Sequence, residues 1–278
     1  MLTLAIPIVL QNLISIGLNM ADTVMIGKLG VDELAAVGTA NRGYFIFSTI
    51  NFGIYSGAAV YVSQYWGVRD VKNIRRTFGI DIMLGVIVSM FFTLAALLFA
   101  PQILTLFTRE QNVIDLGCRY LRIVALSYFF TSMTFAISFN SRAIHRLKMP
   151  TLINALALGI NLVFNYLLIF GKFGMPKLGA TGVAIATALS RLVELVACVI
   201  VSSLSKNVKL HPKYLFVHSK VLTQDFMRLS LPALCNDVSW SVAFSMYSVI
   251  LGHLGTDAVA ANSLVVVVRN IGTVFCFA

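Results

Sequence analysis

The sequence predicts an all-α integral membrane protein of two lobes, of which this chain holds one complete six-helix lobe and the first one to two helices of the second. Three observations predict this. Hydrophobic residues make up 58% of the chain and charged residues 12%, whereas soluble domains average about 45–50% and about 25%. Apolar blocks of membrane-spanning length follow one another along the chain. The first block is also repeated late in the sequence.

Seven apolar blocks are long enough, at roughly 17–25 residues, to cross a bilayer as helices. They lie near 3–26, 41–64, 78–100, 119–140, 151–170, 180–203 and 229–251, and an eighth begins near 256. Strands are not expected, because the blocks lack the alternation of a transmembrane barrel and an open sheet cannot satisfy its backbone in lipid. No basic segment or cleavage site precedes the first block, which is therefore predicted to be a retained span.

The opening stretch Leu4–Val37 recurs at Leu229–Asn262 with a constant offset of 225 positions, so that Pro7 matches Pro232 and Asp32 matches Asp257. This offset exceeds the roughly 20–50 residues of solenoid repeats and indicates a duplicated half-protein. Six spans precede the second copy, as expected when two halves are related by an axis along the membrane normal. We therefore expect a lobe at 1–203, a linker at 204–228 and an incomplete second lobe at 229–278. Residues 1–278 by themselves are not expected to transport a substrate.

The basic residues are distributed unevenly between the loops. The even-numbered connections contain twelve Lys and Arg residues and the odd-numbered ones six. This bias predicts a multi-pass protein of the cell membrane with a cytoplasmic N-terminus and cytoplasmic loops at 67–77, 141–149 and 204–228. Because the net charge of +10 lies between apolar blocks, membrane lipid is the expected partner and nucleic acid is not.

Polar side chains form a stripe on the first predicted helix. Asn12, Ser15, Asn19 and Asp22 follow at steps of three, four and three, which places them on one face. A charged carboxylate in the bilayer costs about 2.5–3.5 kcal/mol. Binding of an ion or substrate is therefore favoured over the alternative that Asp22 only snorkels or caps the helix.

Two further spans carry polar faces. Span two has a seam of five residues that either lines a substrate cleft or serves ordinary helix packing: Asn41, Tyr44, Ser48, Asn51 and Tyr55. Tyr44, Tyr55 and Tyr128 are candidates for holding the apolar or cationic body of a drug. Span five has Asn154, Asn161 and Asn165 on one face, and such oxygens suit Na⁺ and a protonated carboxyl group equally well.

The remaining charges are weaker candidates. Arg191 and Glu194 are expected to neutralise one another across one helical turn, and Asp81 is interpreted as snorkelling at a span end. Asp237 lies inside the seventh span and is a second-rank candidate. The four cysteines are scattered singly and predict neither a zinc site nor a disulfide framework. Since the sequence has no nucleotide-binding, nucleophile-elbow or zinc-protease motif, neither an enzyme nor a cofactor is expected.

Four stretches resemble the multidrug and toxic compound extrusion (MATE) family: NMADTVMIGKLGVDELAAV, VSQYWGVRD, SRAIHRLKMP and INLVFNYLLIFGKFGMPKLGATGVAIAT. The resemblance implies two six-helix lobes that form a V around a cleft and rock to exchange Na⁺ or H⁺ for organic cations. It assigns Asp22 as the ion-binding carboxylate, with Asn161, Asn165 and Thr187 as its partners. Many sodium-coupled members of that family have a glutamate where this sequence has Trp240. Because this chain lacks that glutamate, Asp22 is expected to carry the ion coupling.

The expected function is therefore secondary active efflux of small-molecule drugs or organic cations, with no obligate protein partner. The nearer alternative is a flippase for a lipid-linked saccharide, whose phosphates need several Arg or Lys in the cleft. Spans one, two and five supply only Arg42, near an end. The other alternative, a membrane scaffold that does not transport, has no use for an acid on a polar face.

Overall fold

The computed structural model describes residues 17, 20–108, 110–146, 148–204 and 220–253. Within these ranges the regular secondary structure is helical and contains no strand, so the predicted all-α class is confirmed. Five of the helices are long and apolar enough to cross a membrane. After a helical stretch at 20–27, the elements are α2 (Val31–Gly67), α3 (Val71–Leu98), α4 (Ala100–Thr105), α5 (Gln111–Ala143), α6 (Lys148–Phe170), α7 (Ala180–Leu204) and α8 (Lys220–His253).

The helix ends extend past the predicted apolar blocks because polar residues there stabilise helical turns outside the hydrocarbon. α2 begins at Val31 rather than near residue 41, with Asp32 and Glu33 in its first turn, where acidic groups interact favourably with the helix dipole. Asp70 caps α3 by accepting a hydrogen bond from the Asn73 backbone N–H at 3.1 Å. α8 begins at Lys220, inside the predicted 204–228 linker.

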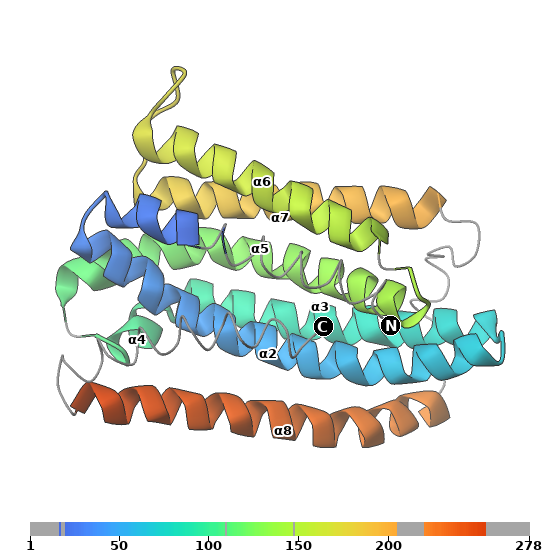
Figure 1. The fold of residues 1–278 in the computed structure, drawn as a ribbon. Helices are drawn as coiled ribbons and strands as arrows, with labels where there is room; N and C mark the ends of the chain where they lie inside the picture. Colours follow the sequence, from blue (N-terminus) through green and yellow to red (C-terminus); the bar gives the residue numbers. More distant parts are fainter. Residues whose placement is uncertain (1–16, 18–19, 109, 147, 205–219, 254–278) are drawn as a thin grey trace.

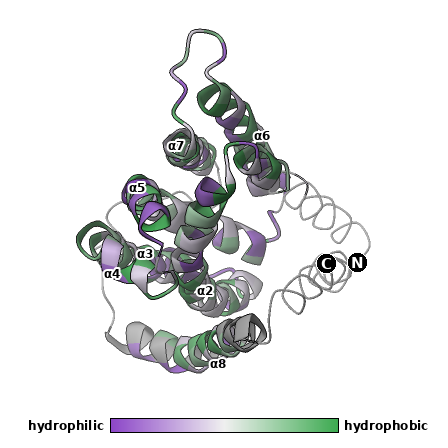
Figure 2. Cartoon of the chain, turned by 90° about the vertical axis from the view of Figure 1, so that its left-hand side faces the viewer, coloured by the Kyte–Doolittle hydropathy of each residue, from purple (hydrophilic) through white to green (hydrophobic). Residues whose placement is uncertain are grey.

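α5 occupies the middle of the bundle, where it contacts α2, α3 and α7 (Figure 1). α7 lies between α5 and α6, and α8 packs against α2 on the opposite side (Figure 2). At the α2–α8 contact, Gly53 and Gly57 let the helices approach closely: a Cβ atom on Gly53 would lie 3.1 Å from the Leu234 Cα atom. Among the described residues α5 therefore connects α2 and α3 to α7, and α8 lies on the other side of α2.

α6 has two chemically different faces. Leu152, Leu156 and Val163 are more than half exposed, as expected for side chains that face lipid. Asn165, by contrast, is fully buried, and α6 contacts α7 on that side. The asparagine face predicted for this helix therefore points into the protein.

A polar network joins α2, α3 and α5 in the interior. The Ser132 hydroxyl lies 2.5 Å from the Tyr55 hydroxyl, 2.9 Å from Asn51 Oδ1 and 3.0 Å from the Gly85 carbonyl oxygen. Gly85 makes this possible, because a Cβ atom there would collide with the Tyr55 hydroxyl. These groups satisfy one another, as buried polar groups must.

Candidate functional site

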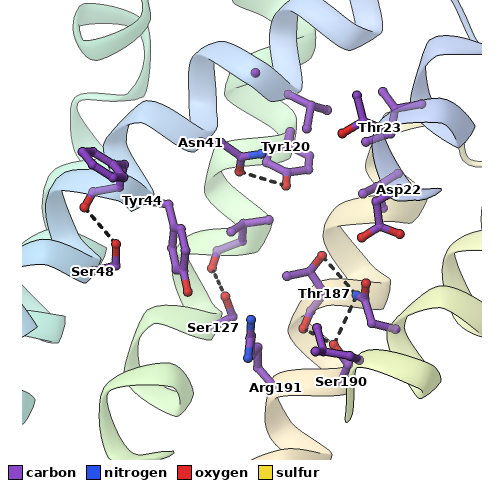
Figure 3. A pocket seen from close by; sticks show the side chains of 18 of the residues that line it. Asp22, Thr23, Asn41, Tyr44, Ser48, Tyr120, Ser127, Thr187, Ser190 and Arg191 are labelled. Carbon is purple, nitrogen blue, oxygen red and sulfur yellow. Dashed lines mark hydrogen bonds between the residues drawn. The ribbon is translucent and has the colours of Figure 1, made fainter. Parts of the chain in front are cut away.

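A pocket of about 460 Å³ opens among residues 20–27, α2, α5, α6 and α7. This volume is within the range of small-molecule sites, roughly 300–1,000 Å³. Apolar side chains such as Ile26, Val37 and Val183 line part of it. Its polar lining, most of it labelled in Figure 3, includes Asp22, Asn41, Tyr44, Ser48, Ser127, Asn161, Thr187, Ser190 and Arg191.

Asp22 is held at this pocket by α6. Asn165 Nδ2 donates to Asp22 Oδ1 at 2.8 Å and lies 3.1 Å from Asn161 Oδ1. Asn161 and Asn165 are one helical turn apart, which brings their carboxamides together. The Asn161 amide extends this hydrogen-bond network to α7, where Asn161 Nδ2 lies 3.5 Å from Thr187 Oγ1 and 3.3 Å from Ser190 Oγ. The structure thus joins in one hydrogen-bonded network the four residues to which the family resemblance assigns ion coupling.

The network has the chemistry of a site for a small cation. Asp22 is half-buried, and among the described residues it has no ion-pair partner. Asn165 Oδ1 is buried and accepts no hydrogen bond from the residues that the structure describes, although such an oxygen is costly to leave unpaired. A carboxylate, two carboxamides and a hydroxyl can offer oxygen atoms to Na⁺, and a protonated carboxyl group could use the same neighbours. The described residues contain no cluster of three His, Cys, Asp or Glu for a metal ion.

Arg191 and Glu194 form an ion pair of 2.7 Å, in which Glu194 is 2% exposed. Asn154 Nδ2 donates to the other Glu194 oxygen at 2.9 Å. The expected neutralisation of this pair is therefore confirmed, and Asn154 serves Glu194 rather than Asp22. The sequence reasoning missed that Arg191 and Ser190 also line the pocket. The signal was available, because they lie three and four residues beyond Thr187 and so share its helix face.

The predicted cleft residues divide between the pocket and the helix interior. Tyr44 lines the pocket. Asn51 and Tyr55 do not, because both are fully buried in the α2–α3–α5 network. Tyr128 is also buried and stacks on Phe47 with 4.6 Å between ring centroids. Asn51 and Tyr55 therefore fit the packing alternative for their seam, and Tyr128 packs in the core rather than at the pocket. Asn12, Ser15 and Asn19 lie outside the described residues.

Two other acidic residues lie away from the pocket. Asp81 is fully buried and accepts a hydrogen bond from Asn140 Nδ2 at 2.7 Å, so the snorkelling interpretation is wrong: the α3–α5 contact encloses this turn. Asp237 is half-buried on α8. Its Oδ2 atom would lie 3.3 Å from a Cβ atom on Gly53 of α2, which places it at the α2–α8 contact.

Comparison with known proteins supplies independent information. The model of the MatE family matches residues 7–167. The chain is 27% identical over 265 residues to a probable multidrug resistance protein NorM of Bradyrhizobium diazoefficiens, with 95% of this chain and 57% of that protein covered. It is 26% identical to the probable multidrug resistance protein YoeA of Bacillus subtilis, with 94% and 57% covered. The chain thus spans a little over half the length of these curated relatives.

Solved structures show the same fold. A crystal structure of MATE in the bent conformation superposes with a TM-score of 0.86 at 20% identity and covers 99% of this chain and 61% of its own. A MOP superfamily transporter from Pyrococcus furiosus, described as having a binding pocket of reversed polarity, superposes with a TM-score of 0.84 at 20% identity, with 98% and 60% covered.

Proposed function

This chain belongs to the MatE family, and from that premise we propose that it forms the ion-binding and substrate-binding lobe of a secondary active multidrug efflux transporter. The transporter exchanges Na⁺ or H⁺ for organic compounds by alternating access. The observation that carries the proposal is the network in which Asp22, Asn165 and Asn161 reach Thr187 at the wall of a drug-sized pocket.

Competition at Asp22 would couple the two transported species. Removing a carboxylate from water costs free energy, and a bound cation recovers part of that cost. A sodium ion, a proton or the cationic group of a drug can each supply the compensating charge, and the single negative charge of Asp22 is compensated by one of them at a time. Ion binding would then weaken drug binding and drug binding would weaken ion binding by the same factor.

The membrane potential can supply the driving force. One net positive charge that moves inward gains about 2.3 kcal/mol per 100 mV, which corresponds to a gradient of roughly fortyfold for a drug without net charge. For a monocationic drug exchanged one for one no net charge moves, and the concentration gradient of the ion supplies the driving force instead. With the cytoplasmic N-terminus predicted from the loop charges, the inside-negative potential drives the cation inward while the drug leaves. No nucleotide is required for this cycle.

The pocket's charges bear on the two alternatives. A lipid-linked saccharide needs several basic groups for its phosphates, whereas Arg191 is the one Lys or Arg among the lining residues that the structure describes. A membrane scaffold has no need of a half-buried carboxylate at a pocket. Both alternatives are therefore less well supported than efflux.

The test is gradient-driven efflux of a fluorescent cation by the protein expressed from its complete gene, in proteoliposomes with Na⁺ and pH gradients imposed separately. Asp22→Asn should abolish ion-coupled efflux while the protein stays folded and inserted, because Asn keeps the side chain's size but cannot change charge. Asn165→Ala should be the second most damaging change.

Asp237→Asn is the matched control, since it removes the same charge away from the pocket, and we expect near-normal efflux. Expression level and thermal stability should be similar for Asp22→Asn and the wild type. Normal efflux by Asp22→Asn would refute the coupling role. An inactive Asp237→Asn variant together with a normal Asp22→Asn variant would move the ion site to the second lobe.

A further inference from the structure

Arg191 brings a positive charge to the same pocket that Asp22 lines. Its side chain keeps 22% of its surface exposed, whereas that of its partner Glu194 keeps 2%. Figure 3 shows the Arg191 side chain near Ser127 of α5 and Ser190 of α7. The ion pair therefore has a buried acidic end and a basic end that reaches the pocket.

The guanidinium group has capacity for a second partner. It carries five N–H donors, and Nη1 is the atom that bonds Glu194. No other hydrogen bond of Arg191 to the rest of the described chain is found. Because a guanidinium can hold two carboxylates at different edges, Glu194 can fix its orientation while another edge serves a ligand.

The two pocket charges are separated along the helices. Asp22 is bonded to Asn165, and Asn161 is one turn away at the level of Thr187. Arg191 lies a further turn along α7. At 5.4 Å per turn, the Asp22 carboxylate and the Arg191 guanidinium are about 5–11 Å apart along the helix axis. Tyr44 lines the same pocket. A flat aromatic ligand with a cationic end and an anionic end fits this arrangement.

We propose that Arg191 is a specificity-determining anion subsite, so that the preferred substrates are zwitterionic aromatic compounds rather than simple organic cations. The cationic end of the substrate pairs with Asp22, and its carboxylate pairs with Arg191. Glu194 and Asn154 act as positioning residues for the guanidinium. This inference rests on the proposed transport function and names the substrate class of the same pocket.

The experiment measures the binding of two matched dyes to the purified protein expressed from its complete gene, by fluorescence anisotropy. One dye is a rhodamine methyl ester, a permanent cation, and the other is the corresponding rhodamine free acid, which adds a carboxylate to the same cation. The wild type should bind the free acid more tightly. Arg191→Gln should weaken binding of the free acid by about tenfold or more and change binding of the ester by less than about twofold.

Three further variants make the result specific. Arg42→Gln removes the same charge one residue from Asn41 but outside the pocket lining, and it should leave both affinities unchanged. Because Arg191→Gln leaves Glu194 buried without its ion-pair partner, the double variant Arg191→Gln with Glu194→Gln provides a neutral pair. It should show the same selective loss of the free acid, and Arg191→Lys should restore part of that binding.

Equal losses for both dyes in the double variant would overturn the proposal, because they would show that Arg191 only supports the structure. A wild type that prefers the ester would overturn it as well. Asp22→Asn should weaken the binding of both dyes. If it changes the affinity of neither dye, the role proposed for Asp22 is refuted, whereas the comparison of the two dyes at Arg191 still tests the anion subsite. A wild type that binds neither dye would refute both proposals.

Discussion

Gly182→Ala tests whether the spacing between α6 and α7 maintains the polar network at the pocket. Gly182 of α7 packs against Leu168 of α6, and a Cβ atom at this position would lie 2.9 Å from the Leu168 carbonyl oxygen and 3.0 Å from its Cβ atom. Ordinary van der Waals contacts begin at 3.4 Å. Alanine would therefore separate the helices locally by about 0.5 Å.

This displacement would reach the weakest bonds of the network. Asn161 Nδ2 is already 3.5 Å from Thr187 Oγ1, and a shift of that size extends the distance to about 4 Å, beyond hydrogen-bond range. The Asn165–Asp22 bond does not cross this interface and should survive. Loss of one hydrogen bond costs about 0.5–1.5 kcal/mol, which corresponds to roughly a two- to tenfold increase in the coupling-ion concentration for half-maximal efflux.

The assay combines efflux at varied ion concentration with thermal unfolding in detergent. Overpacking should destabilise Gly182→Ala by about 1–3 kcal/mol. Gly159→Ala on α6 is the matched control: a Cβ atom there has no neighbour within 4 Å, so the variant should be neutral or slightly more stable. Leu168→Ala should not rescue Gly182→Ala, since the obstructing atoms are ones that alanine retains. Unchanged unfolding and ion dependence in Gly182→Ala would refute the reasoning.

Two other predictions follow from the packing and the loop charges. Gly85→Ala should lower the free energy of unfolding by about 1–3 kcal/mol relative to Gly159→Ala. The reason is that the added Cβ atom would collide with the Tyr55 hydroxyl and approach the Ser132 hydroxyl to 2.7 Å. An unfolding midpoint equal to that of the wild type would contradict the buried network. The topology can be tested in intact cells with a cysteine-free variant and a thiol reagent that does not cross the membrane. The reagent should label Lys172→Cys and should not label Lys72→Cys, two exposed positions on opposite ends of the bundle. The reverse pattern would overturn the cytoplasmic N-terminus.

The helical type of the long elements was predictable from the sequence because lipid imposes one solution on an apolar block: a helix that satisfies its own backbone. The short helix α4 (Ala100–Thr105) was not predicted. The same physics made the polar faces visible, since a repeated asparagine on an apolar helix needs a partner inside the protein. Asn161 and Asn165 with Asp22 are the example. The helix ends were less predictable, because α2 and α8 continue into regions where water can also satisfy the backbone.

Which polar face lines a pocket and which is sealed in a helix interface depended on the tertiary structure. Asn41, Tyr44, Asn51 and Tyr55 share one seam of α2, yet the first two line the pocket and the last two are enclosed where Gly85 lets α3 approach. Helical spacing specifies only that side chains share a face, and the neighbouring helix decides what covers each turn. For the same reason the sequence predicted the Arg191–Glu194 pair, whereas the packing of α5, α6 and α7 decided that Glu194 is buried and Arg191 reaches the pocket.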